Sequence, residues 1–361
     1  MKLLVQPCDG ILPVLEGIES AKDRLEIVIF RCDLAEVEKA LAEAVSRGVH
    51  VHALITYTNR GGEKSLRRLE LRLLAAGVTV ARTADNLARY HDKLMIIDRR
   101  ELYVLAFNFT RIDIRLSRSF GLITRDRALV EEAVNLFEAD VKRQPYSPGL
   151  ATFLVSPENA RTQLASFIKG ARKQLLIYDP EVSDPTMIRL LQERSKAGVD
   201  IRILGRAVSP RSNLTARQML HMRLHTRTIL RDGQQGFIGS QSLRRIELDA
   251  RREVGIIFRD ARIVSRLATL FEDDWALTER TAEQVAREEA QPAAKVAKRV
   301  AKAIVKVLPP VTEIVEVTVK KVVGPDTKIE LNAEEIEETV RDAVKDAVKQ
   351  VVKEVVGAGA K

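Results

Sequence analysis

YHDKLMIIDRRELYVLAFNFT, residues 90–110, places a histidine and a lysine two positions apart, just before a short apolar run that ends in aspartate. A second stretch of the same design, HTRTILRDGQQGFIGSQS, occupies residues 225–242, in a chain that has only five histidines. The two stretches belong to a longer internal repeat. A repeat of this size decides the fold, because each copy is expected to form its own structural unit.

Residues 91–140 align with residues 225–274 at a constant offset of 134 and without a gap, and fourteen of the fifty columns are identical. The identical columns include His91/His225, Asp98/Asp232, Arg111/Arg245, Ile112/Ile246, Arg118/Arg252 and Asp140/Asp274. The two segments are therefore copies of one unit.

Upstream of the aligned segments, both halves show the order strand, helix, strand. The first copy consists of RLEIVIF (24–30), a helix-periodic segment (35–47) and RGVHVHALI (47–55), and the second of QLLIYDP (174–180), residues 185–196 and AGVDIRILG (197–205). The first half has an additional helix and strand over residues 66–82. A strand-helix-strand unit with a glycine turn after the helix is typical of parallel strands in an α/β sandwich.

We therefore predict an α/β protein made of two similar sandwich halves, each with its own sheet, and a tail. The expected boundaries are 1–148, 149–280 and 281–361. In the repeated LFEAD (136–140) and LFEDD (270–274), Leu and Phe are predicted to lie in the core with the acids outside. The run RRIELDARRE (244–253) is interpreted either as a border of an anionic substrate or as solvated surface.

The tail is rich in Ala, Val, Lys and Glu. Residues 292–308 predict a basic amphipathic helix, residues 311–323 alternate like a strand, and residues from Asn332 onward predict a final helix with a capping box. The tail is expected either to dock on the body or to self-associate. Binding of the basic helix to a membrane surface or to nucleic acid is the alternative.

The composition favours anionic partners and a reducing compartment. The net charge is +9 and the sequence pI is about 9.5, which does not distinguish phospholipid, nucleic acid or phosphorylated metabolites. The presence of only two cysteines argues against a disulfide framework or a cysteine-rich metal site. Neither a signal peptide nor an apolar run of roughly 18 residues is found, so we expect a cytoplasmic protein with at most peripheral membrane contact.

Equivalent histidines in two fused copies can meet across a pseudo-twofold axis, so that His91 and His225 face one pocket. One imidazole can then attack as nucleophile while the other protonates the leaving group and later activates water. Lys93 points to the same side of an extended segment as His91 and supplies a positive charge for phosphoryl oxygens. The pattern indicates a phosphodiester substrate.

The arrangement of His91, Lys93 and Asp98, followed by LAFN, resembles the HxKxxxxD...GSxN signature of the phospholipase D superfamily. Residues 225–242 resemble its second copy, and the resemblance covers roughly residues 1–280. It implies two α/β halves that share one active site. It also implies a two-step, metal-independent displacement through a phosphohistidine, without a cofactor.

The two copies depart from this signature in different ways. The first keeps the two motif residues Asn108 and Thr110, but has Leu105-Ala106 in place of Gly-Ser. The second keeps four motif residues, His225, Asp232, Gly239 and Ser240. It has Arg227 in place of the lysine and Ser242 in place of the asparagine. Twenty-eight residues after each histidine the family often carries an acid; here these positions hold Ser119 and Glu253.

The resemblance implies a role for each of these side chains. Glu253 is expected to hydrogen-bond His91 and make it the nucleophile, which leaves His225 as general acid and base. Lys93 and Arg227 are expected to bind phosphate oxygens. Asp98 and Asp232 are interpreted as supports of the site, although contact with substrate is equally compatible with the pattern. The predicted substrate-binding residues are Asn108, Thr110, Ser240 and Ser242.

The leading hypothesis is a phosphodiesterase or phosphatidyl transferase that acts on phospholipid, similar to phospholipase D or cardiolipin synthase. A metal-independent nuclease is the first alternative, but aromatic residues at 4% offer few platforms for base stacking. A degenerate, non-catalytic binding or scaffold protein is the second alternative, because of Leu105-Ala106, Ser119 and Arg227. The oligomeric state is left open by the sequence.

Overall fold

The computed structural model describes residues 1–57, 63–207, 214–220, 222–290, 344 and 348. Residues Met1–Thr278 form one compact unit, and Glu279–Lys361 belong to a second. The predicted basic helix at 292–308, the strand at 311–323 and the final helix fall almost entirely outside the described residues.

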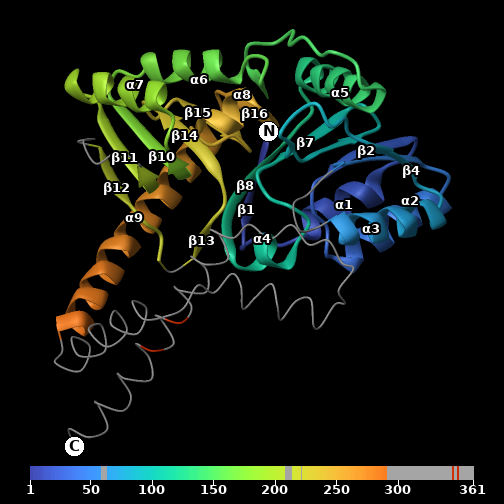
Figure 1. Ribbon diagram of the computed structural model, residues 1–361, viewed down its shortest axis with the longest axis horizontal. Coiled ribbons are helices and arrows are strands. Elements are labelled where there is room, and N and C mark those ends of the chain that lie inside the picture. The colour runs from blue at the N-terminus through green and yellow to red at the C-terminus, as the bar shows by residue number, and fades with distance from the viewer. Residues whose placement is uncertain (58–62, 208–213, 221, 291–343, 345–347, 349–361) are drawn as a thin grey trace, which may run out of the picture. The chain divides into compact units, whose positions relative to one another are not determined.

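The first half follows the predicted order of strands and helices (Figure 1). Its elements are β1 Lys2–Gln6, α1 Leu12–Ser20, β2 Arg24–Ile29, α2 Ala35–Ser46, β3 His50–Ile55, α3 Glu63–Ala75, β4 Thr79–Arg82, β5 Arg89–Tyr90, β6 Leu94–Ile97, β7 Glu101–Leu105, α4 Arg111–Arg115, β8 Ser117–Thr124 and α5 Arg127–Lys142. The helix and strand expected over residues 66–82 are α3 and β4, so that prediction is confirmed.

The second half repeats this order, and its described residues, which exclude 208–213, contain no counterpart of α3. Its elements are β9 Phe153–Ser156, α6 Ala160–Lys169, β10 Gln174–Val182, α7 Pro185–Lys196, β11 Asp200–Ala207, β12 Thr215–Arg217, β13 Arg223–Leu224, β14 Arg227–Arg231, β15 Gln235–Gly239, α8 Arg245–Asp249, β16 Arg251–Phe258 and α9 Ala261–Ala290. The short strand β12 takes the edge position that β4 has in the first half.

Two mixed sheets form the body. The first has the order β1-β8-β7-β6-β2-β3-β4. The second is a separate sheet with the order β12-β11-β10-β14-β15-β16, in which equivalent strands occupy equivalent positions. The strands β2, β3 and β4 are parallel, as are β10 and β11, which confirms the predicted strand-helix-strand units. The hairpins β6-β7-β8 and β14-β15-β16 are antiparallel.

Residues shared by the two copies also set the local turns. Gly48 and Gly198 follow α2 and α7 with φ of 87° each, a left-handed conformation that glycine adopts without a steric penalty. Asp126 and Asp260, another identical column, each accept a hydrogen bond from a backbone N–H in the first turn of α5 and α9. The equivalent sequence positions therefore build equivalent helix ends.

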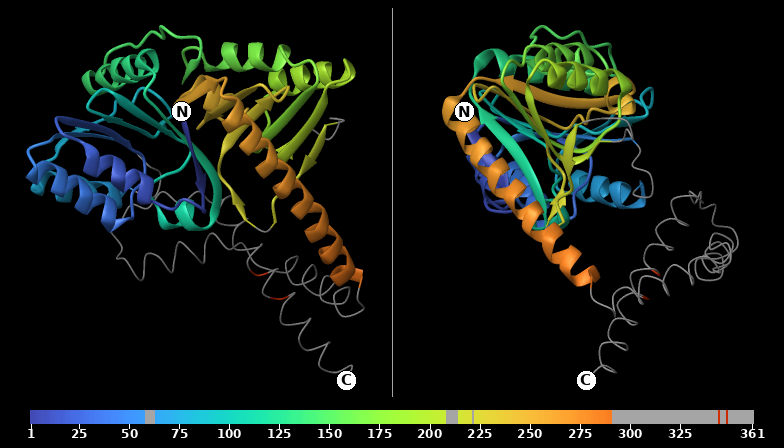
Figure 2. Two further views of the ribbon diagram at one scale, coloured as in Figure 1. Left: turned by 180° about the vertical axis from the view of Figure 1, so that it is seen from behind. Right: turned by 90° about the vertical axis from the view of Figure 1, so that its left-hand side faces the viewer.

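Three apolar clusters hold the layers together. One lies between the first sheet and α1, α2 and α3, whose blue ribbons cover one face of that sheet in Figure 2. A second lies between the second sheet and the helices α6 and α7. The third and largest includes residues of both sheets together with α5 and α9. This shared core explains why the two halves form one compact unit.

The halves also exchange short strands. The strand β5 of the first half pairs with β16 of the second, and β13 of the second half pairs with β8 of the first, both in parallel. Each eight-stranded sheet therefore contains one strand from the other half. Figure 1 shows β13 beside β8 where the halves meet. The residue after each exchanged strand is one of the two motif histidines.

Two buried ion pairs cross the same interface. The guanidinium of Arg118 donates to both carboxylate oxygens of Asp274 at 2.8 Å each, and that of Arg252 donates to Asp140 at 3.0 Å each. Each arginine belongs to one half and its aspartate to the other. These residues occupy two identical columns of the repeat, so the duplication preserved the contacts that join its copies.

This finding corrects the prediction for LFEAD and LFEDD. Leu and Phe are in the core as expected, but Asp140 and Asp274 are only 3% and 1% exposed. The first acid of the second motif, Glu272, does lie outside, where it pairs with Arg202. The prediction was wrong for the last acid of each motif, because it took no account of an arginine arriving from the other half.

Within the described ranges, no helix combines the length and the apolar character needed to cross a bilayer.

Substitution of Asp274 is expected to destabilise the body much more than substitution of its neighbour Glu272. Asp274→Asn leaves the buried Arg118 without a charge partner, which costs about 3–5 kcal/mol for a buried pair. Glu272→Gln breaks a more exposed pair, which contributes about 0–1 kcal/mol. Urea unfolding of both variants measures the difference. Equal losses would contradict a joining role for the Arg118–Asp274 pair.

Candidate active site

The backbone of the second half and one of its carboxylates hold His91. Its N–H donates to the carbonyl of Arg252 at 2.8 Å, so the exchanged strand β5 fixes the main chain. Its Nδ1 lies 2.9 Å and 3.1 Å from the two carboxylate oxygens of Glu253. The predicted contact is therefore present. Glu253 fixes the ring with the proton on Nδ1, which leaves the lone pair of Nε2 available.

The second histidine is held at the equivalent place by a different set of groups. The N–H of His225 donates to the carbonyl of Arg118 at 3.0 Å. Its Nδ1 faces a carboxylate oxygen of Asp113 at 3.5 Å, an ion-pair distance rather than a hydrogen bond. The hydroxyl of Ser119, at the position equivalent to Glu253, has no hydrogen-bond partner. Each histidine is therefore held by its backbone and by an acid of the other half.

Both imidazoles are neutral at pH 7 in the free site. Burial, followed by the charges of Lys93 and Arg227, holds the pKa of His91 well below its ordinary value. Burial also lowers the pKa of His225, and Arg227, Arg223 and Lys93 lower it further, while Asp113 opposes them. A neutral His91 is ready to act as a nucleophile, because only the unprotonated nitrogen can attack.

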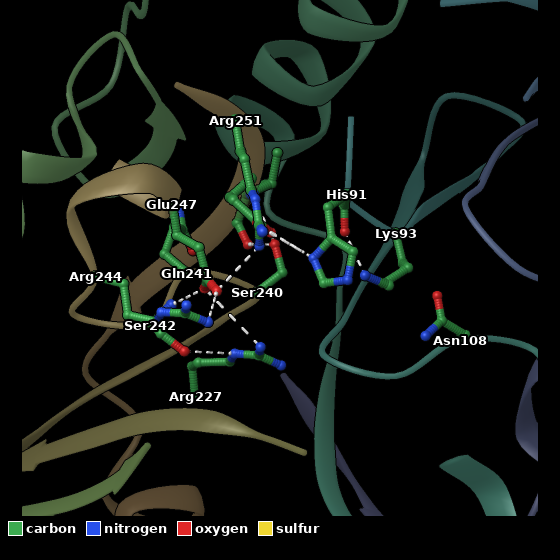
Figure 3. A network of polar contacts seen from close by, with 12 residues as sticks. His91, Lys93, Asn108, Arg227, Ser240, Gln241, Ser242, Arg244, Glu247 and Arg251 are labelled. Carbon is green, nitrogen blue, oxygen red and sulfur yellow. Dashed lines mark hydrogen bonds and ion pairs between the residues drawn. The ribbon is translucent and has the colours of Figure 1, made fainter. Parts of the chain in front are cut away.

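The two motif cations are buried beside their histidines. The Nζ of Lys93 donates to the carbonyl of His91, and the guanidinium of Arg227 donates to the carbonyl of His225 at 2.6 Å. Burial lowers the pKa of Lys93 to about 7, with Glu253 opposing this change. In Figure 3 the Arg227 guanidinium points toward the space bordered by His91, Lys93 and Asn108. Charged groups of both halves converge there.

Arginine at position 227 and serine at position 242 fit each other. The Nε of Arg227 donates to the Ser242 hydroxyl at 3.0 Å, and its other end lies 3.9 Å from Glu247. Arginine is larger than lysine, and serine is smaller than the asparagine found at the equivalent position 108. The two departures from the family signature therefore compensate each other in volume and in hydrogen bonding.

A second pair of departures is also coupled. The Ser240 hydroxyl accepts a hydrogen bond from the N–H of Val254 at 3.1 Å and donates to the carbonyl of the same residue at 3.4 Å. Its interaction with the carboxylate of Glu253 lowers the pKa of that acid, although burial raises this pKa. In the first half Ala106 replaces the serine and Ser119 replaces the acid. The half that lacks the carboxylate thus also lacks the hydroxyl that supports it.

Asn108 and Thr110 lie in the loop before α4. The amide Nδ2 and the backbone N–H of Asn108 both donate to Asp113, at 2.7 Å and 2.8 Å, while its Oδ1 has no partner. The hydroxyl of Thr110 caps α4 by accepting from the N–H of Asp113. Binding of substrate by Asn108, Thr110, Ser240 and Ser242 stays a prediction, and Thr110 and Ser240 have structural partners that account for them.

The two motif aspartates brace loops at the opposite ends of their strands. The carboxylate of Asp98 accepts from the N–H groups of residues 22–24, and Asp232 accepts from those of residues 172–174. Both residues have positive φ, of 50° and 54°. They follow β6 and β14, whereas Lys93 and Arg227 stand at the starts of these strands. This geometry agrees with their interpretation as supports.

Sequence reasoning missed two acids of the site. Asp113 and Glu247 are equivalent at the offset of 134, and each accepts the N–H of the Asn108 or Ser242 position. The repeat alignment contains this signal, since the column 113/247 is acidic in both copies although its two residues differ. Of the run 244–253, Arg251 reaches Glu247 at 3.1 Å beside the site, whereas Arg252 joins the halves.

A family model described as "Cardiolipin synthase, PLD-like domain" matches residues 14–141 and 164–275. These segments include both motifs and most of the body. The chain belongs to the phospholipase D-like family. The predicted superfamily and fold are confirmed by this match.

Among curated proteins, the polyphosphate kinase of Pseudomonas aeruginosa is 27% identical over 227 residues, which cover 57% of this chain and 33% of that protein. The polyphosphate kinase of Lactiplantibacillus plantarum is 23% identical over 316 residues, with coverages of 77% and 43%. The phospholipase D-like chain thus spans between a third and a half of the length of these relatives.

Solved structures share the fold. Polyphosphate kinase from Porphyromonas gingivalis matches with a TM-score of 0.63 and 19% identity, over 76% of this chain and 50% of that one. Phosphatidylserine synthase from Haemophilus influenzae matches with a TM-score of 0.56 and 12% identity, over 77% and 86%. At these identities the likeness concerns the fold alone.

Arg227 and Ser242 are expected to show energetic coupling. Arg227→Lys loses the bond to the Ser242 hydroxyl, and Ser242→Asn places a larger amide against the guanidinium. The double variant recreates the lysine and asparagine of the first half. Unfolding free energies of the four proteins are expected to give a coupling of about 0.5–3 kcal/mol in favour of the double variant. Simple additivity would show that the two departures are unrelated.

Proposed function

We propose that this chain is a phosphoryl-transfer enzyme that works through a covalent phosphohistidine on His91. The observation that carries the proposal is the contact of Glu253 with Nδ1 of a buried, neutral His91. A carboxylate in this position fixes the tautomer and the ring orientation, and it stabilises the positive charge that the imidazole acquires during attack.

In the first step, Nε2 of His91 attacks the phosphorus atom of a diester. A P–N bond forms as the bond from phosphorus to the leaving oxygen breaks. His225 gives that oxygen a proton, so the leaving group departs as a neutral alcohol. The charges of Lys93 and Arg227 offset the negative charge on the non-bridging oxygens.

In the second step, His225 is neutral and removes a proton from water or from an acceptor alcohol. The activated oxygen attacks phosphorus on the face opposite His91, the P–N bond breaks, and His91 is regenerated. Water gives hydrolysis and an alcohol gives transfer. The chain's own residues supply nucleophile, acid, base and charge for both steps.

We propose a phospholipid head group as the first substrate class. The description of the matching family as cardiolipin synthase-like supports a lipid phosphodiester. The positive net charge of the chain is compatible with an anionic membrane surface, where a cytoplasmic protein would meet this substrate.

A phosphoanhydride is the second candidate, because several curated relatives are polyphosphate kinases. Arginine supports this reading through its bidentate binding of phosphate oxygens, and Arg227, Arg251 and Lys93 give the site several cations. The chain covers only part of each relative, so the activity of the whole relatives is not transferred to it.

Phosphoenzyme trapping tests the reaction and the nucleophile. The protein is mixed with phosphatidylglycerol, bis-p-nitrophenyl phosphate or inorganic polyphosphate in EDTA, quenched in base and mapped by mass spectrometry. We expect an added phosphatidyl, p-nitrophenylphosphoryl or phosphoryl group on His91 with one donor class, and none in His91→Ala. A modification on His225 and never on His91 would reverse the roles; none with any donor would favour a binding protein.

The acidity of the leaving group separates the roles of the two histidines. His225→Ala is expected to reduce transfer from an alkyl diester by about 10²–10⁴-fold, the contribution typical of general acid catalysis. Its first-step rate with a p-nitrophenyl leaving group is expected to fall much less, because this group departs without a proton. His91→Ala abolishes both reactions. Equal losses of His225→Ala on both substrates would contradict its role as the acid.

The pH dependence follows from the lowered histidine pKa values. The first step needs His225 protonated and His91 neutral. The value of kcat/KM therefore decreases when the pH is raised above the pKa of His225, and it also decreases when the pH is lowered below the pKa of His91. Both pKa values lie below 6.5 in the free site. We therefore expect the maximum of kcat/KM for an alkyl diester below pH 6.5. A maximum above pH 7 would contradict this assignment.

A further inference from the structure

The acid that serves His225 is not at the position that serves His91. Glu253 lies on β16 and reaches His91, but the equivalent residue on β8 is Ser119, whose side chain is too short and uncharged. A histidine that must both give and take a proton still needs its second ring nitrogen held, because ring orientation decides where the proton goes.

Asp113 lies at this second nitrogen. It is 3% exposed, and its Oδ2 accepts from the backbone and side chain of Asn108 while it faces His225 Nδ1 at 3.5 Å. Its other oxygen accepts from Arg223 at 2.5 Å. Arg223 begins the exchanged strand β13, two residues before His225. Asp113 therefore contacts both the ring of His225 and the strand that carries it.

The equivalent acid of the second half has a different set of partners. Glu247 accepts from the N–H of Ser242 at 2.7 Å, as Asp113 does from Asn108, but its ion pairs are with arginines 227, 244 and 251. His91 has Glu253 instead. The loop-capping role is thus common to both acids, whereas a contact with histidine distinguishes Asp113.

We infer that Asp113 is the positioning residue of His225, in place of the carboxylate that Ser119 does not supply, and that it aims Nε2 of His225 at the leaving oxygen. The inference rests on the proposed function for its catalytic part. Asp113 touches no reacting atom in this scheme. It acts by holding the imidazole that transfers the proton.

The charges around His225 give Asp113 a second effect. The charged groups that act on this imidazole are Asp113 from α4, Arg223 from β13, Arg227 from β14 and Lys93 beside β6. The three cations lower the pKa of His225, and Asp113 raises it. His225 in turn, with the N–H of Asn108 and with Arg223, holds the pKa of Asp113 below its ordinary value although burial opposes this.

The histidine NMR spectrum tests the pairing without any assumption about the reaction. Five histidines give few signals, and His225→Gln assigns the one in question. Asp113→Asn keeps the size and the acceptor for Asn108, but removes the charge; we expect the pKa of His225 to fall. Arg223→Gln is the matched control of opposite sign and is expected to raise it. An unchanged His225 pKa in Asp113→Asn would overturn the pairing.

Kinetics test the consequence for catalysis. On an alkyl diester, Asp113→Asn is expected to lower kcat at least about 10-fold, less than the roughly 10²–10⁴-fold that general acid–base catalysis contributes in full, and to leave KM unchanged. The kcat of the same variant is expected to fall less when the substrate has a p-nitrophenyl leaving group. A second substitution, Ser119→Glu, places a carboxylate at the position equivalent to Glu253 and is expected to restore part of the lost kcat.

The two measurements separate the inference from the proposed function. If the wild-type protein forms no phosphohistidine while the pKa of His225 still follows Asp113 and Arg223, the proposed function fails and the pairing stands. If the wild-type protein catalyses the reaction, and Asp113→Asn has the same kcat and the same His225 pKa, the inference fails while the proposed function stands. Urea unfolding of each variant shows that a lost signal is not a lost fold.

Discussion

The exchange of one short strand between the two halves is the constraint on which the site depends. The N–H of His91 is bonded to Arg252 of the other half, and that of His225 to Arg118. The same two arginines form the buried ion pairs with Asp140 and Asp274. The backbone that positions each histidine is therefore continuous with the contacts that join the halves. A site between two separate domains would lose its geometry with any change in their docking; here the docking and the site share residues.

The two copies have diverged in pairs of residues rather than one at a time. Arg227 occurs with Ser242 and hydrogen-bonds it. Ala106 occurs with Ser119, whereas the other copy has Ser240 and Glu253 at these two positions. Not every change is compensated, because the buried Ser119 hydroxyl has no hydrogen-bond partner, which costs about 1–3 kcal/mol. The coupled changes at the other positions favour two histidines with separate tasks. A duplicated unit can specialise in this way, because each half contributes a different part of one site.

Much of the architecture could be predicted because it follows from local patterns. The repeat, the strand-helix-strand units, and the extra α3 and β4 were within reach of spacing and alignment, whereas the contact of Glu253 with His91 was implied by the resemblance to the phospholipase D superfamily. The burial of Asp140 and Asp274 could not be predicted in this way, because an acid on a helix looks solvent-facing until its arginine is known to come from the other half. Asp113 was missed for a related reason. Its role depends on α4 of one half lying beside the exchanged strand of the other, and such a contact between distant segments has no periodicity in the sequence.

The charge balance of the site leads to a last step of synthesis. The free site holds several buried cations, and burial together with these charges keeps both histidines neutral and lowers the pKa of Lys93 to about 7. A general acid, however, has to be protonated before it can act. An anionic phosphoryl group placed between Lys93 and Arg227 supplies the missing negative charge, and it raises the pKa of His225 when the proton is needed. His91 is affected less, because Glu253 already holds its Nδ1 proton. In the proposed mechanism substrate binding thus favours the protonated form of His225, the general acid, whereas His91 is already neutral and able to attack before the substrate binds.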